Sequence, residues 1–161
     1  MNSKQSFVLQ TSVVFVLAGS LLANARPGQK ADDKPATTAK VEGTWRLTST
    51  KYGNVANFTD IPKAEQTHLK YIIGGRFIWV DYDQKTREIK SSAGGKYALS
   101  GESYKEVPEY GLGKDFASIR DKQQSFTVKI KGDKLRQSGI LKLGGANATT
   151  LKLEEVWERV K

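Results

Sequence analysis

The sequence predicts an all-β domain, folded as an antiparallel up-and-down barrel of about eight to ten strands with one or two short helical turns. Segments with alternating apolar and polar residues recur along residues 41–161, Gly and Asn bound them, and helical periodicity is nearly absent. Closure into a barrel would also remove the exposed edges of such a sheet. A sandwich with Greek-key crossovers is the alternative.

The first 25 residues predict a signal peptide. Lys4 is their only charged residue, an apolar run covers residues 7–22, and Ala23-Asn24-Ala25 has the small-x-small pattern of a cleavage site. The run is shorter than the roughly 20 apolar residues that span a bilayer, and an uncleaved anchor is the alternative. We therefore expect cleavage near Ala25 and a secreted or periplasmic protein.

The next segment, residues 26–40, predicts a flexible linker. Pro, Gly, Ala, Lys, Asp and Thr dominate it, and it shows no apolar periodicity. The folded domain is therefore expected over residues 41–161.

The strands of this domain follow from alternation and turn residues. The first is expected over residues 41–50, with Trp45 and Leu47 on one face. Strands over 68–73 and 76–82 form a hairpin around Gly74-Gly75. Later strands are expected, with a second tight turn at Gly132-Asp133, over residues 88–92, 95–101, 103–107, 125–131, 134–143 and 149–160.

Two segments interrupt the strand pattern. Residues 60–66 begin with a capping Asp60 followed by Pro62, which favours one short helix. Residues 114–122 place Phe116 and Ile119 three positions apart, which suits a helical turn against the barrel mouth or an irregular loop.

Composition excludes several kinds of site. The chain has 161 residues, enough for one domain, with no Cys and one His. Disulfides, thiolate zinc sites and iron–sulfur clusters are therefore excluded, as is a metal site of several histidines. We expect neither a metal nor another cofactor.

The positive charge is spread along the chain. The formal net charge is +9, and Lys129, Lys131, Lys134 and Arg136 decorate one expected hairpin. A nucleic-acid interface would need a basic stripe with aromatic stacking platforms, so we expect no nucleic-acid partner. An anionic envelope polymer or a membrane surface is the kind of partner that this charge permits.

The two ends of the domain resemble a known group of barrels. Gly43-Thr44-Trp45 matches the Gly-x-Trp motif of lipocalins and related calycin barrels, and the last expected strand carries Arg159. In lipocalins the first-strand Trp closes the barrel floor beneath a late Arg. The resemblance therefore implies that Gly43, Trp45 and Arg159 close the barrel, with a cation–π contact between the last two.

Most of the domain resembles a narrower family. The matching runs lie at residues 43–45, 75–79, 94–97, 104–106, 132–133 and 155–159, and they look like a family of secreted bacterial lipocalin-like domains with no assigned activity. The resemblance implies a calycin-type barrel that binds a ligand, and it supplies no catalytic residues. The sequence differs from typical lipocalins in having no Cys and no long C-terminal helix.

The last strand mixes charged and large apolar residues on one face: Leu151, Leu153, Glu155, Trp157 and Arg159. Glu155 and Arg159 would lie about 13 Å apart along the strand, too far for a direct ion pair. In the structural interpretation Arg159 covers Trp45, and Glu155 bonds a Tyr or Lys of a neighbouring strand. In the functional interpretation Glu155 lines a cavity and orients a polar group of a ligand.

Aromatic and polar residues on the inward faces predict a small-ligand pocket. The candidates are Trp79, Tyr104, Glu106, Gln137 and Glu155. The same residues suit a barrel whose interior is filled by side chains. His68 is expected at the surface, because it follows a polar loop, and Asp81 is interpreted as part of a turn with Asp83.

These observations lead to three hypotheses of function. The first is an exported, non-enzymatic barrel that binds a small, partly apolar molecule of unknown identity in its interior. The second is a cell-envelope interaction module that uses its basic outer surface. The third is an enzyme in which Glu106 or Glu155 acts as general acid or base.

Overall fold

The computed structural model describes residues 40–144 and 149–161. The predicted signal peptide over residues 1–25 and the predicted linker, apart from Lys40, lie outside the described residues.

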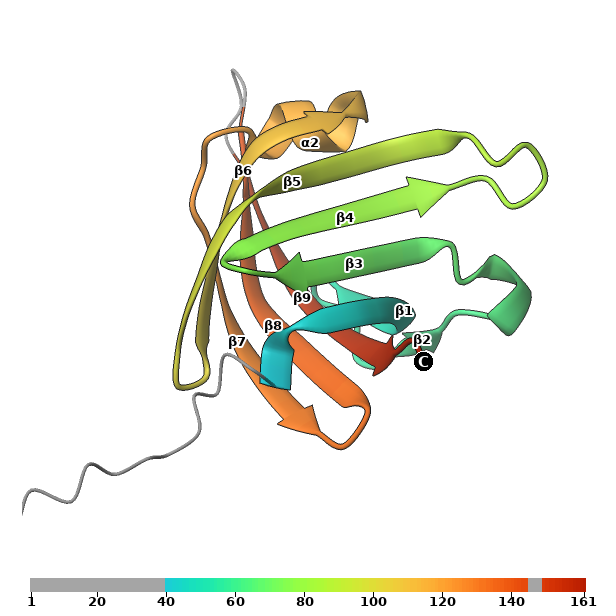
Figure 1. The fold of residues 1–161 in the computed structure, drawn as a ribbon, viewed down its shortest axis with the longest axis horizontal. Coiled ribbons are helices and arrows are strands. Elements are labelled where there is room, and N and C mark those ends of the chain that lie inside the picture. The colour runs from blue at the N-terminus through green and yellow to red at the C-terminus, as the bar shows by residue number, and fades with distance from the viewer. Residues whose placement is uncertain (1–39, 145–148) are drawn as a thin grey trace, which may run out of the picture. The chain divides into compact units, whose positions relative to one another are not determined.

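The described residues form one antiparallel β-sheet that closes on itself (Figure 1). Each long strand pairs with its neighbour in the chain, and β1 closes the barrel by pairing with both β3 and β9. The two-residue strand β2 (Thr59–Asp60) is not part of the barrel wall; it pairs only with two residues of β1. The eight barrel strands are β1 (Gly43–Tyr52), β3 (His68–Ile73), β4 (Arg76–Tyr82), β5 (Ile89–Ser100), β6 (Ser103–Leu112), β7 (Gln124–Lys131), β8 (Lys134–Leu143) and β9 (Thr149–Arg159). The predicted barrel is confirmed and the sandwich is wrong.

One pair of predicted strands is a single strand. The sequence predicts separate strands over residues 88–92 and 95–101, but β5 runs through Gly94 and Gly95 without interruption. The register with β6 shifts between them, and a side chain on Gly95 would collide with the Val107 carbonyl oxygen. These glycines therefore allow a bulge and a close backbone approach.

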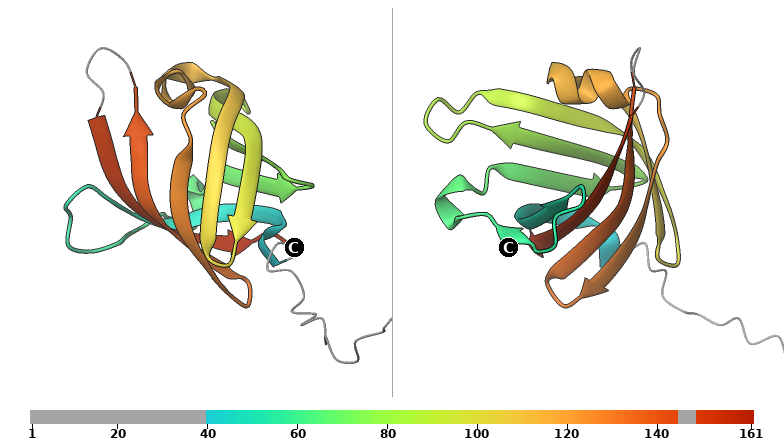
Figure 2. Two further views of the ribbon diagram at one scale, coloured as in Figure 1. Left: turned by 90° about the vertical axis from the view of Figure 1, so that its left-hand side faces the viewer. Right: turned by 180° about the vertical axis from the view of Figure 1, so that it is seen from behind.

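Both segments expected to be helical contain a helical turn. The first is the 3₁₀-helix η1 (Lys63–Glu65), and the second is α2 (Gly113–Ile119). Phe116 and Ile119 of α2 are buried and pack with Ala93 of β5. This contact fixes the helix at one end of the barrel (Figure 2).

The two ends of the barrel differ. Three tight turns, at Gly74-Gly75, Gly101 and Gly132-Asp133, lie at one end, which we call the base. The longer connections, including η1, the β4–β5 loop and α2, lie at the other end, which we call the mouth (Figure 2). Side chains with access from outside are therefore expected near the mouth.

The base is sealed by Trp45. Its ring is fully buried, and its indole N–H donates to the Val41 carbonyl at 2.8 Å. The Arg159 guanidinium lies 4.1 Å from the ring centroid and donates to the carbonyls of Glu42 and Lys40. The contact implied by the lipocalin resemblance is thus present, and a buried apolar core lies above it.

Gly43→Ala is expected to destabilise the barrel by about 2 kcal/mol more than Gly53→Ala. Both glycines have positive φ, +132° and +68°, so both substitutions strain the backbone. Only a methyl group at Gly43 would collide with the Arg159 guanidinium; nothing lies near one at Gly53. Urea unfolding of the two variants measures the difference, and equal losses would show that Arg159 adds nothing at the base.

Candidate functional site

A cavity of about 400 Å³ lies in the mouth half of the barrel, above the buried core. Its volume is in the range of small-molecule sites. Its apolar wall is formed by residues of β4, α2, β7, β8 and β9: Trp79, Ile119, Phe126, Leu141, Leu143, Leu151, Leu153 and Trp157. Its polar groups come from eight elements, α2 and every barrel strand except β5: Tyr52, His68, Lys70, Asp81, Glu106, Asp115, Ser118, Gln124, Gln137 and Glu155.

The floor of the cavity holds one buried cation. The Lys70 ammonium lies 3.0 Å from a carboxylate oxygen of Glu106 and 3.0 Å from the amide oxygen of Gln137, to which it donates. The Lys70 and Glu106 side chains are 4% and 5% exposed. The ammonium also lies 5.0 Å from the centroid of Trp157. Because a buried charge needs both charge and hydrogen-bond partners, Lys70 joins β3, β6 and β8 across the interior.

A second buried acid, Glu155, is fixed by hydrogen bonds from two neighbouring side chains. One oxygen of Glu155 accepts a hydrogen bond from the Tyr52 hydroxyl at 2.7 Å, and the other accepts one from the Trp157 indole at 3.1 Å. Burial raises the pKa of Glu155, against the charge of Lys70 and these two hydrogen bonds, which lower it. Burial and the charge of Glu155 in turn raise the pKa of the Tyr52 hydroxyl above its usual range.

His68 stands between two tryptophans. Its ring centroid is 5.2 Å from that of Trp79 and 5.3 Å from that of Trp157, the second in an edge-on arrangement. Burial, followed by the charge of Lys70, lowers the pKa of His68 to about 4, although Asp81 and Asp115 oppose the shift. The imidazole is therefore neutral at pH 7.

Two further carboxylates lie toward the mouth. Asp81 is opposite His68 in the β3–β4 register and accepts a hydrogen bond from the Thr67 hydroxyl at 2.7 Å. Asp115 lies in the first turn of α2. Among the described residues, neither forms an ion pair with a Lys or Arg side chain.

Comparison with solved structures identifies the architecture. A lipocalin-like protein from Bacteroides uniformis superposes with a TM-score of 0.51 at 13% sequence identity, over 74% of this chain and 97% of that one. An uncharacterized protein from Bacteroides eggerthii superposes with a TM-score of 0.51 at 14% identity, over 74% and 98%. The fold is lipocalin-like. The sequence matches no model of a known protein family and no curated protein.

The lipocalin-like barrel brings four of the five predicted ligand-binding residues to the cavity. Trp79, Glu106, Gln137 and Glu155 line it. The fifth, Tyr104, is fully buried outside the lining, where it packs against Tyr97 with ring centroids 5.4 Å apart. Whether the four bind a ligand stays a prediction.

Two expectations about single residues were wrong. His68 is not at the surface but half-buried on the cavity wall, because the strand begins at this residue and turns it inward. Asp81 is part of β4, as the strand predicted over residues 76–82 has it, and not of a turn with Asp83. Asp83 alone caps the loop by accepting hydrogen bonds from the amides of Lys85 and Thr86.

Sequence reasoning missed five polar residues of the site: Tyr52, Lys70, Asp115, Ser118 and Gln124. Alternation along β3 could have indicated Lys70, because it shares a face with the apolar Ile72. No feature of the sequence indicates a role for Gln124. Its amide bonds both backbone groups of Lys142 at 2.7 and 3.1 Å, and so extends the β7–β8 pairing through a side chain.

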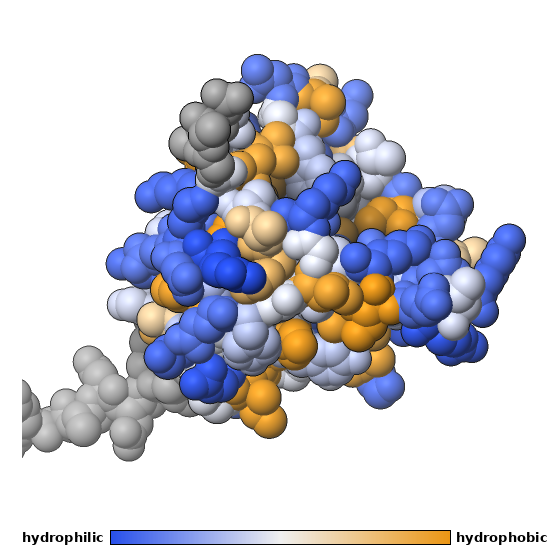
Figure 3. Space-filling view, turned by 90° about the horizontal axis from the view of Figure 1, so that it is seen from above, coloured by the Kyte–Doolittle hydropathy of each residue, from blue (hydrophilic) through white to orange (hydrophobic). Residues whose placement is uncertain are grey.

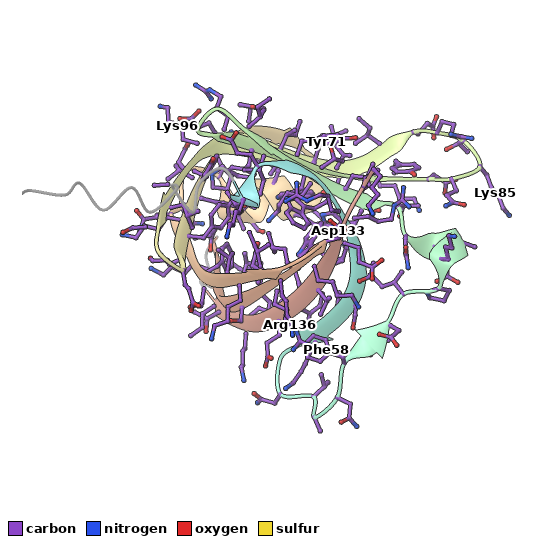
Figure 4. The ribbon with its side chains drawn as sticks, turned by 60° about the horizontal axis from the view of Figure 1, so that its bottom comes forward. Phe58, Tyr71, Lys85, Lys96, Asp133 and Arg136 are labelled. Atoms are coloured by element: carbon purple, nitrogen blue, oxygen red, sulfur yellow. The ribbon has the colours of Figure 1, made fainter. Side chains whose placement is uncertain are left out.

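On the outer surface of the described residues, the basic side chains are spread and several are paired with acids. On the β7–β8 hairpin, Lys129 and Lys134 pair with Glu102 and Glu158 at 3.7 and 3.6 Å, and Arg136 lies on the outer face of β8 (Figure 4). Apolar side chains reach the surface in patches separated by hydrophilic ones (Figure 3).

The described residues contain neither a membrane-spanning helix nor a cluster of metal ligands. They contain no helix long and apolar enough to span a membrane. They also contain no group of three or more potential metal ligands among His, Cys, Asp and Glu.

We expect the His68 imidazole to titrate near pH 4 rather than near 6.5, because burial and Lys70 disfavour its charge. It is the only His in the chain, so NMR can follow a single imidazole resonance. Since the unfolded state binds this proton near pH 6.5, the folded state loses about 3 kcal/mol as pH falls from 6.5 to 4. His68→Gln removes that loss, and a wild-type resonance titrating near 6.5 would contradict the prediction.

Lys70→Met is expected to reduce the free energy of unfolding by about 3–5 kcal/mol, since it leaves Glu106 buried without a cation. Adding Glu106→Gln should restore most of the loss, because the new amide is neutral and can bond Gln137. Chemical denaturation of the single and double variants measures both effects. A double variant as unstable as Lys70→Met would show that the pair does not determine stability.

Proposed function

We propose that this protein is an exported, non-enzymatic lipocalin-like barrel that binds a small, partly apolar molecule in its interior. The observation that carries the proposal is the cavity of about 400 Å³, which has an apolar wall on β8 and β9 and a polar floor. A barrel of eight strands can be filled by its own side chains, so an open interior of this size is a specific feature.

The way in which the floor is built supports binding. Lys70, Glu106 and Gln137 bond one another, and Glu155 is bonded by Tyr52 and Trp157. These groups keep fixed positions without a ligand, because each has a protein partner. A preorganised site loses little conformational entropy when it binds.

The same contacts support a non-catalytic role for the two interior acids. A general acid or base must be free to exchange a proton with a bound substrate. The Glu106 carboxylate is paired with Lys70, and both oxygens of Glu155 accept hydrogen bonds from protein side chains. We therefore assign both carboxylates to the architecture of the cavity.

Native mass spectrometry of the protein purified from its export compartment tests the proposal. We expect a co-purifying mass that disappears on denaturation. Leu141→Trp should abolish it, because Leu141 lines the cavity and a larger side chain would fill part of it.

The matched control is Ile140→Trp, which also replaces a branched aliphatic residue by Trp, one position earlier on β8. Ile140 lies on the outer face and is 54% exposed. It should leave the bound mass unchanged. A wild-type protein that remains free of any bound species, or a species retained by Leu141→Trp and lost by Ile140→Trp, would contradict interior binding.

A further inference from the structure

The charge of the cavity is opposite to the charge of the protein. The chain carries a formal net charge of +9, yet the cavity is lined by four acids and only one Lys. The acids are Asp81, Glu106, Asp115 and Glu155. Lys70 pairs with Glu106 at 3.0 Å, and none of the other three acids forms an ion pair with a Lys or Arg among the described residues. An anionic ligand would therefore meet repulsion.

Most hydrogen-bond donors on the wall are already used. The Lys70 ammonium donates to Glu106 and Gln137, and the Tyr52 hydroxyl and the Trp157 indole donate to Glu155. The Lys70 ammonium keeps a third N–H, but its charge is paired with Glu106; the other remaining donors, such as the Trp79 indole, are uncharged. The ligand is thus offered no free cation.

The free groups are mainly acceptors. The Asp81 carboxylate receives one hydrogen bond, from Thr67, and so keeps capacity for more. The His68 imidazole is enclosed by Trp79 and Trp157 and makes no hydrogen bond to a described residue. A neutral imidazole carries one acceptor nitrogen and one N–H donor, and this ring faces the cavity beside Asp81.

The aromatic rings add to this preference. The faces of tryptophan rings attract cations. The Lys70 ammonium already lies 5.0 Å from the centroid of Trp157, so Trp79, beside His68, is the ring left to a ligand cation. Leu141 and Leu151 complete an apolar wall toward the mouth. A ligand with a cationic head and an apolar body matches both parts of the cavity.

We propose that the cavity binds a small organic amine in its protonated form, with the ammonium group near Asp81 and His68 and the apolar body against the tryptophan and leucine side chains. This inference rests on the proposed function, because it specifies the ligand class of the same cavity. Asp81 supplies the charge for the ammonium, and Asp115, at the start of α2, adds to the negative potential at the mouth.

Three probes that differ only in their head group test the inference. They are 2-phenylethylamine, 2-phenylethanol and phenylacetate, compared by isothermal titration calorimetry on the purified protein at pH 7. We expect the amine to bind at least about tenfold more tightly than the alcohol, and phenylacetate to bind most weakly.

Asp81→Asn should weaken the amine about tenfold and leave the alcohol unchanged, since the amide keeps the shape and the acceptor for Thr67 but lacks the charge. The control is Asp133→Asn, the same change of charge on the β7–β8 turn at the base (Figure 4). It should affect neither probe.

Equal or tighter binding of the alcohol or of phenylacetate would overturn the amine inference while leaving interior ligand binding intact. Failure of all three probes to bind would also overturn it. In that case the native mass spectrum still decides separately whether the cavity carries another molecule.

Discussion

Pairing between the first and last strands is the constraint on which the rest of the structure depends. β1 meets β9 from Trp45 opposite Arg159 to Tyr52 opposite Leu153. This closure leaves the long strands without free edges and creates an interior that is separate from the surface. It also brings the guanidinium of Arg159 over Trp45, so the interaction that closes the sheet also seals its base.

Closure forces polar groups into a small enclosed volume, and their arrangement follows from the need to pair them. Lys70 is tolerated because Glu106 and Gln137 lie on strands across the interior. Glu155 is tolerated because Tyr52 and Trp157 donate to it. The Lys70 contacts link strands distant in the sheet, whereas those of Glu155 stay on β9 and its neighbour β1. The floor of the cavity is therefore both a structural network and the surface that a ligand would meet.

The cavity lining is mainly acidic, whereas the chain as a whole is basic. Basic residues outnumber acidic residues in the chain, and several basic side chains on the outer surface pair with acids there. Inside, acids outnumber the single ammonium, and an uncharged His68 stands among aromatic rings. Electrostatics and hydrogen-bond capacity therefore favour ligands that supply positive charge and donors.

The sequence by itself determined the barrel, most of its strands, its two helical turns and the base. Alternation has a period of two residues, and it is a local property that can be read along each strand, as is the Gly-x-Trp motif. It also placed Glu155 and Gln137 on inward faces. Only the tertiary structure decided that the interior is open, that Tyr104 lies below it, and that Lys70, His68 and Asp81 belong to it. These facts depend on which strands face one another across the barrel, and such contacts join residues far apart in the chain.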